Sequence, residues 1–343
     1  MNTVKKKFSF VDFAGKNILL VVLLVMVIAM VFVNKNFLTL SNLINVLRNM
    51  AVTGIMACAM TMMMVGGEFD LSFGSTLGLT TCIIPLLTEN LSAAGMSVTA
   101  GALIGILIAF VAATLVGCIN AYFVVKWRLP AILVTLAVQF TVYGVAGTIT
   151  GGYPQYTLPE WFAFFGKGTI GGKVPYSIVI FLVVFVLFYI IMSHTKFGRT
   201  MYVVGGNAEA ARLSGISTKK YKAWIFIVMQ WAACLAGIIF ASQLAGGTQA
   251  YGRGTEFNVI AGVIIGGTGL AGGRGTMRGT FIGMLFLNII MNAMTIANLS
   301  EYLQYIVRGI IMLAAILLSE AQGIWANKKR IKSAQQLQEM MQE

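Results

Sequence analysis

The sequence has little charge and few of the residues with which enzymes bind metals or transfer protons. Only 10% of its 343 residues are Asp, Glu, Lys or Arg, whereas soluble proteins carry about 25%. The single histidine, His194, excludes a multi-histidine metal site, and the few carboxylates lie mostly at the ends of apolar stretches. The composition therefore predicts no metal site and no catalytic site, and it argues against a soluble protein.

The sequence also lacks paired cysteines and a nucleotide-binding loop, and both absences narrow the class of protein. The four cysteines lie one per apolar stretch with no paired spacing, which predicts neither a disulfide framework nor a metal site: Cys58, Cys82, Cys118 and Cys234. The glycine-rich segment 266–275 contains no G-x-x-x-x-G-K-[ST] pattern, and none occurs elsewhere. The chain therefore carries no P-loop for ATP, and no cofactor is expected to bind to it.

Apolar runs are what the sequence has instead. Hydrophobic residues make up 58% of the chain, and about 20 apolar residues in a helix cross a bilayer. The runs predict an all-α integral membrane protein with about ten spans, forming one transmembrane domain over 1–343. They lie at roughly 18–33, 51–65, 71–87, 98–118, 131–149, 176–192, 223–241, 259–271, 279–296 and 302–318.

The net charge of +13 follows from the membrane topology. With the N-terminus inside, ten spans place most Lys and Arg in cytoplasmic segments, and both termini are then cytoplasmic. The exceptions are Lys35, Arg48, Lys167, Lys173, Arg253 and Arg308. This is the positive-inside bias, so no nucleic-acid partner is needed to explain the charge. Arg308 lies inside the last span, close enough to its outer end to reach the interface.

Two basic segments are expected outside the bilayer on the cytoplasmic side. In the segment 193–222, Asn207 precedes good helix formers and Gly215 follows them, which predicts a short capped helix. The tail at about 325–343 is basic and rich in glutamine, and is expected to be a solvated cytoplasmic end.

A weak internal repeat is suggested at an offset of 188 residues. Residues 68–71 (Glu-Phe-Asp-Leu) match residues 256–259 (Glu-Phe-Asn-Val), with glycines at corresponding later positions. In the span count, the copies would run in opposite directions across the membrane. Inverted repeats of this kind are common in transporters, whose binding sites form at the repeat interface.

Polar residues in and beside the spans are candidates for a substrate pathway. Carboxylates near hydrocarbon are costly and usually face a cavity, a partner or water. The alternative for Glu68 and Asp70 is a solvated cytoplasmic turn in which Asp70 or Ser72 caps the next helix. The pathway candidates are Asp70, Ser72, Asn120, Thr135, Glu256, Asn258 and Thr268.

Four segments resemble one known family. Residues 66–75 (GGEFDLSFGS), 130–136 (PAILVTL), 195–216 (TKFGRTMYVVGGNAEAARLSGI) and 252–275 look like the ribose-type permeases of bacterial ABC sugar importers, in the same order along nearly the whole chain. The resemblance implies a bacterial inner-membrane permease of ten helices that imports a monosaccharide, with ribose the leading substrate, by alternating access.

The resemblance also implies partners. These are a second permease copy, an extracytoplasmic sugar-binding protein and an ATPase chain with nucleotide-binding cassettes, which holds the ATP and magnesium, so the permease itself is not an enzyme. In that family a cytoplasmic helix docks onto the ATPase. It maps here to Asn207, Glu209, Ala210, Ala211, Arg212 and Gly215.

Two departures leave the sugar open. The family pattern has an aliphatic residue where Phe69 stands and an aspartate where Asn258 stands. Other pentoses, hexoses, furanoses and nucleosides are carried by related permeases. The alternative function is a secondary sugar transporter that works alone on an ion gradient, for which only Glu68, Asp70 and Glu256 could provide ion sites.

Overall fold

The computed structural model describes residues 18–35, 37–317 and 320. A helix overlaps each of the ten apolar stretches. The helices are α2 (Ile18–Val33), α3 (Leu40–Val65), α4 (Phe73–Ala93), α5 (Val98–Ala121), α6 (Ala131–Ile149), α8 (Tyr176–His194), α11 (Thr218–Leu244), α12 (Thr255–Ile265), α13 (Met277–Ile296) and a last helix whose described part covers 301–317. The predicted all-α membrane architecture is confirmed. The basic tail at 325–343 and the lysines before α2 lie outside the described residues.

Short elements complete the described chain. A π-helical turn, η1 (Tyr122–Lys126), extends α5. Between α6 and α8 lie the 3₁₀ turn η2 (Glu160–Phe162), α7 (Ala163–Gly166) and a two-stranded antiparallel hairpin of β1 (Thr169–Ile170) and β2 (Val174–Pro175). Two helices, α9 (Lys196–Gly206) and α10 (Ala208–Leu213), follow α8.

Six described helices are long and apolar enough to cross a membrane: α3, α5 with η1, α6, α8, α11 and α13. The predicted span at 259–271 is different. Helix α12 has 11 residues, about 16 Å at the helical rise of about 1.5 Å per residue. It ends because Gly266 and Gly267 follow it. Gly267 has φ +90°, a backbone conformation that residues with a side chain rarely adopt.

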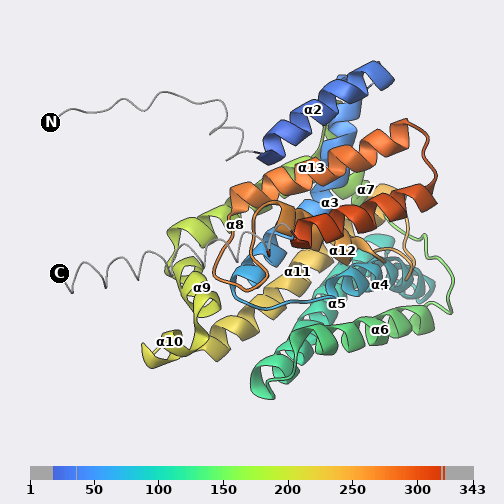
Figure 1. The fold of residues 1–343 in the computed structure, drawn as a ribbon. Helices are drawn as coiled ribbons and strands as arrows, with labels where there is room; N and C mark the ends of the chain where they lie inside the picture. Colours follow the sequence, from blue (N-terminus) through green and yellow to red (C-terminus); the bar gives the residue numbers. More distant parts are fainter. Residues whose placement is uncertain (1–17, 36, 318–319, 321–343) are drawn as a thin grey trace, which may run out of the picture.

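Helices α3 and α11 form the centre of the bundle. In α11, 72% of an apolar stretch of 18 residues is buried by the rest of the protein, whereas the corresponding share in α6 and in α8 is 28%. Helix α11 packs against α3, α4 and α5, and α12 packs against α13 (Figure 1). Glycines allow neighbouring helices to approach closely: a Cβ on Gly105 would lie 3.0 Å from the Cα atom of Ile84.

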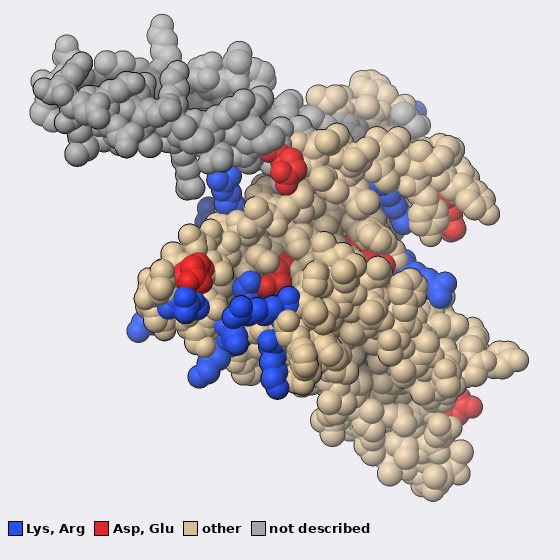
Figure 2. Space-filling model, turned by 60° about the horizontal axis from the view of Figure 1, so that its bottom comes forward, with Lys and Arg blue, Asp and Glu red and all other residues tan. Residues whose placement is uncertain are grey.

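The two ends of the bundle differ. Helices α9 and α10 project at one end, hereafter the α10 end, and the connection from α6 to α8 lies at the other, hereafter the loop end (Figure 1). Lys and Arg side chains gather at the α10 end (Figure 2). The segment from α9 to the start of α11 supplies Lys196, Arg199, Arg212, Lys219, Lys220 and Lys222. The positive-inside rule predicts that the α10 end faces the cytoplasm.

Candidate functional site

The chain breaks between α3 and α4 and turns back into the bundle. Gly66 ends α3 and Gly67 adopts φ +77°, a left-handed conformation that glycine takes at little cost. Residues 68–72 then lead inward, so that the side chains of Asp70 and Ser72 are fully buried. The alternative of a solvated turn at Asp70 is therefore wrong.

Four polar side chains meet at this break, and we call them the Asp70 cluster: Asp70, Ser72, Asn120 and Gln230. The backbone N–H and the hydroxyl of Ser72 donate to Asp70 Oδ1 at 2.7 and 2.6 Å. Asn120 Nδ2 and Gln230 Nε2 donate to Asp70 Oδ2 at 3.1 and 2.6 Å. Because the carboxylate accepts four hydrogen bonds, its burial is compensated without a cation.

Neighbouring contacts fix the break further. Thr135 on α6 accepts a hydrogen bond from the backbone N–H of Leu71 at 3.0 Å. Glu68 forms an ion pair with Lys222 of α11 at 2.6 Å, with both side chains mostly buried. The structure therefore brings together four of the proposed pathway residues in a buried, hydrogen-bonded arrangement: Asp70, Ser72, Asn120 and Thr135. The amide oxygens of Asn120 and Gln230 have no partner among the described residues.

A second buried carboxylate lies at the start of α12. Glu256 is 3% exposed, and its Oε1 accepts a hydrogen bond from Gln139 Nε2 of α6 at 2.7 Å. Its Oε2 has no hydrogen-bond partner among the described residues, and a Cβ on Gly74 would overlap it. Helices α4 and α12 therefore begin side by side inside the bundle.

The glycine-rich segment before α12 allows this approach. Gly252 (φ +91°) lies directly against the carbonyl oxygen of Gly74, and a Cβ on Gly247 would overlap the carbonyl oxygen of Thr81. A chain leaving α11 at Leu244 can therefore return into the bundle before α12 starts. Irregular backbone at such depth is tolerated in membrane proteins only where protein or a cavity surrounds it.

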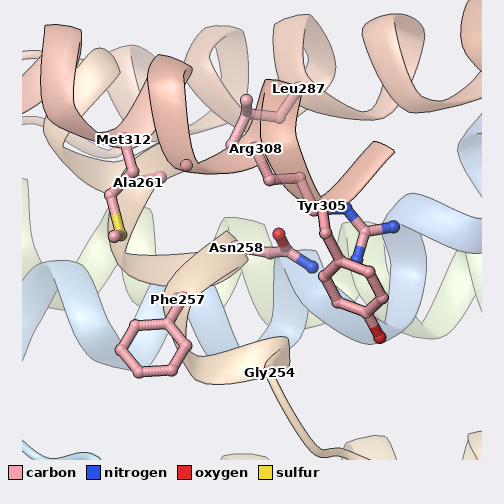
Figure 3. Close-up of a pocket in the computed structure, with 9 residues that line it drawn as sticks. Gly254, Phe257, Asn258, Ala261, Leu287, Tyr305, Arg308 and Met312 are labelled. Atoms are coloured by element: carbon pink, nitrogen blue, oxygen red, sulfur yellow. The ribbon is translucent and has the colours of Figure 1, made fainter. Parts of the chain in front are cut away.

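The other two pathway candidates lie apart. Asn258 is half-buried and lines a pocket between α12 and the last helix, together with Phe257, Tyr305 and Arg308 (Figure 3). Thr268 is fully buried in the loop after α12, against Gly275. The structure therefore does not place the seven candidates in one site.

The repeat is not reproduced at the level of single positions. Asp70 precedes α4, whereas Asn258, its proposed counterpart, lies inside α12. Glu68 pairs with Lys222 near the α10 end, while Glu256 lies deep in the bundle. What does recur is a broader order: a long helix, a glycine-containing break, and a helix that starts inside the bundle.

The predicted short helix after Asn207 is present as α10. Asn207 Oδ1 accepts a hydrogen bond from the backbone N–H of Ala210 at 2.9 Å, as an N-cap does. Gly215 adopts φ +79° and follows the helix as its stop. Ala211 is buried against the protein, while Glu209 and Arg212 form an exposed ion pair. Hydrogen bonding from Arg212, together with its positive charge, lowers the pKa of Glu209.

A backbone contact connects α9 to the end of α3 and to the loop after α12. It is formed by Gly205, Val65 and Gly273, and we call it the glycine junction. Gly205 in the last turn of α9 lies directly on the carbonyl oxygen of Val65, at the end of α3. The same carbonyl accepts a hydrogen bond from Gly273 N at 2.8 Å, in the loop after α12. Helix α9 leads through Asn207 into α10, so only the last turn of α9 and Asn207 separate α10 from this contact.

These features define the class of protein: a multi-pass membrane protein in which two helices start inside the bundle and a capped helix projects at the basic end. Broken helices of this kind are typical of transporters. The chain matches the family described as "Branched-chain amino acid transport system / permease component" over residues 42–316, and it belongs to that family.

Curated relatives cover nearly the whole chain. The ribose import permease protein RbsC of Escherichia coli K12 is 34% identical over 303 residues, 87% of this chain and 92% of its own. The Bacillus subtilis 168 protein of that name is 31% identical, with 86% and 90% covered. The L-arabinose transport system permease protein AraH of E. coli K12 is 34% identical, with 91% and 93% covered. No solved structure matches the chain.

Three side chains in these sites were not among the seven pathway candidates. From sequence, Gln139 and Gln230 are polar residues within the spans that could hydrogen-bond a sugar or another helix, and in the structure they donate to the two buried carboxylates. Arg308 was interpreted as reaching the interface, yet it lines the pocket beside Asn258. Sequence position alone gave no indication of which helix each would face.

Proposed function

We propose that this chain is the permease subunit of an ATP-binding-cassette importer that carries a monosaccharide, with ribose the leading candidate, across the bacterial inner membrane. The observation that carries the proposal is the 34% identity to ribose and arabinose permeases over about nine-tenths of the chain. The partners are an ATPase with nucleotide-binding cassettes, an extracytoplasmic sugar-binding protein and a second permease copy. The ATP and magnesium belong to the ATPase, and the permease performs no chemistry.

A monosaccharide is favoured over a branched-chain amino acid, despite the family's description. The relatives named for ribose and arabinose match on both sides of both helix breaks, because they cover 86% to 91% of this chain. An amino acid would also bring a carboxylate and an ammonium group into the membrane, and such charges require paired groups. The two deeply buried carboxylates, Asp70 and Glu256, already accept hydrogen bonds from neutral amides.

The coupling helix is α10, through Asn207, Glu209, Ala210, Ala211, Arg212 and Gly215. Support comes from its position at the basic end and from its exposed charges, while Ala211 anchors it. Docking of such a helix into a groove is a recurring recognition mode. Closure of the cassettes would move α10, and the glycine junction would pass that movement to α3 and α12, opening and closing the pathway by alternating access.

Affinity purification from native membranes in mild detergent tests the assignment. The wild-type chain is compared with a Glu209→Ala, Arg212→Ala double variant. A nucleotide-binding chain should co-purify with the wild type and be depleted at least about tenfold with the double variant, since charge-assisted contacts at an interface contribute about 1.5–3 kcal/mol each.

The control removes the same two charges at the loop end, with Glu160→Ala and Lys167→Ala, and should retain the ATPase. If no ATPase accompanies the wild type, the importer assignment is wrong and a stand-alone secondary transporter becomes the better account. If the ATPase accompanies all three proteins equally, the importer assignment stands and α10 is not its docking helix.

A further inference from the structure

Arg308 is half-buried and lines an open pocket between α12 and the last helix, where Tyr305 is 62% exposed. Arg308 lies about two turns into the last helix, about 10 Å from the outer end of that helix at the α-helical rise. The ion pairs of the described residues are Glu209–Arg212 and Glu68–Lys222, so no described carboxylate neutralises Arg308. Its Nε donates to Met291 Sδ at 3.1 Å, which is a weak acceptor.

The pocket combines polar and aromatic groups. The amide of Asn258 and the guanidinium of Arg308 face the same space, and the ring of Tyr305 lies beside them (Figure 3). The guanidinium carbon lies 5.3 Å from the centre of that ring. Phe257 is 48% exposed on the same side of α12, and Leu287 and Met312 supply apolar walls.

The volume of the pocket and the charge of its lining residues indicate which kind of ligand it can bind. Its volume of about 190 Å³ lies below the range of about 300–1,000 Å³ typical of sites for drug-sized ligands, so the pocket admits only a small ligand. Arg308 only donates hydrogen bonds, and Gly254 places the N-terminal, partially positive end of α12 at the same wall. The ligand must therefore offer several acceptor oxygens, together with an apolar face for the aromatic rings.

We infer that this pocket is a contact site for the transported monosaccharide, and that Arg308 and Tyr305 are residues that determine sugar specificity. Arg308 and Asn258 donate to hydroxyl oxygens, while Tyr305 and Phe257 cover the C–H face of the sugar ring. The inference rests on the proposed function. It assigns the Asp70 cluster, in which the carboxylate is buried and accepts four internal hydrogen bonds, a positioning role beside the pathway, and it places the sugar at α12 and the last helix.

ATP-driven uptake of labelled D-ribose into proteoliposomes tests the inference with the complete transporter. Arg308→Ala and Tyr305→Ala should each lower uptake per ATP hydrolysed at least about tenfold, because a hydrogen bond from a charged group contributes about 1.5–3 kcal/mol. Arg308→Lys should restore part of the uptake and change the preference between D-ribose and L-arabinose. Tyr302→Ala is the matched control, since Tyr302 lies one turn away on the same helix, is 82% exposed and does not line the pocket.

The outcomes separate the two proposals. If the wild type takes up neither sugar with ATP, the proposed function itself fails. If the wild type transports ribose and the Arg308 and Tyr305 variants match Tyr302→Ala in rate and preference, only the inference is overturned. It is also overturned if the two variants lose the second permease copy from the purified complex, because the pocket is then a subunit interface. ATP-driven uptake of L-leucine that depends on Arg308 would replace the sugar with a carboxylate ligand.

Discussion

At the scale of single residues, the buried carboxylates are the main features of this protein. Asp70 is held by two donors from Ser72 and by one amide each from α5 and α11. A buried acceptor with four donors ties three segments of the chain together. Its partners Asn120 and Gln230 are far away in sequence, so no local pattern could predict them.

Asp70→Asn should destabilise the protein by about 1–3 kcal/mol, because the new amide group presents N–H donors to the donors of Asn120 and Gln230. Thermal unfolding in detergent measures the effect as a lower Tm. Glu89→Gln is the control, since Glu89 contacts Thr157 in an exposed position, and its Tm should be unchanged. Equal Tm values for the two variants would show that the Asp70 cluster does not hold the break.

At the scale of elements, the sequence predicted those features that depend on neighbours in the chain. The Asn207 cap, the helix formers after it and Gly215 lie within nine residues, so α10 could be located from sequence. The ten apolar stretches likewise became helices. The bounds of α12 differ from the predicted stretch at 259–271. The helix begins at Thr255, after Gly252 has brought the chain against the carbonyl oxygen of Gly74 in α4, and it ends before Gly266.

The glycine junction gives a prediction at this scale. A Cβ on Gly205 would overlap the carbonyl oxygen of Val65, whereas the nearest atom to a Cβ on the adjacent Gly206 is 4.0 Å away. Gly205→Ala should therefore cost about 1–3 kcal/mol, as overpacking does, and reduce sugar uptake per ATP hydrolysed. Gly206→Ala should leave both quantities near their wild-type values.

Sequence could not separate these two glycines, since both belong to the same helix end. Proteoliposomes that contain the complete transporter provide the measurement, with ATP hydrolysis and uptake recorded on the same preparation. A Gly205→Ala protein with wild-type stability and an unchanged ratio of uptake to hydrolysis would contradict a mechanical role for the contact.

At the scale of the whole molecule, the charge distribution orients the chain and the breaks suggest its mechanism. Basic side chains concentrate at the α10 end (Figure 2), while α4 and α12 start next to each other inside the bundle. A transporter needs coupling at one face and movable helices in the middle, and the glycine junction lies between the two. Residue spacing indicated both features, but only the fold shows how they are connected.

The most direct test of the proposal that this chain belongs to an ATP-driven sugar importer is uptake of labelled D-ribose. It is measured with the complete transporter in proteoliposomes, with and without ATP. The account predicts uptake that requires ATP and the binding protein, and that falls at least about tenfold when Glu209 and Arg212 are both replaced by alanine. Uptake that proceeds without ATP, or that is driven by an ion gradient and unaffected by the double variant, would contradict it.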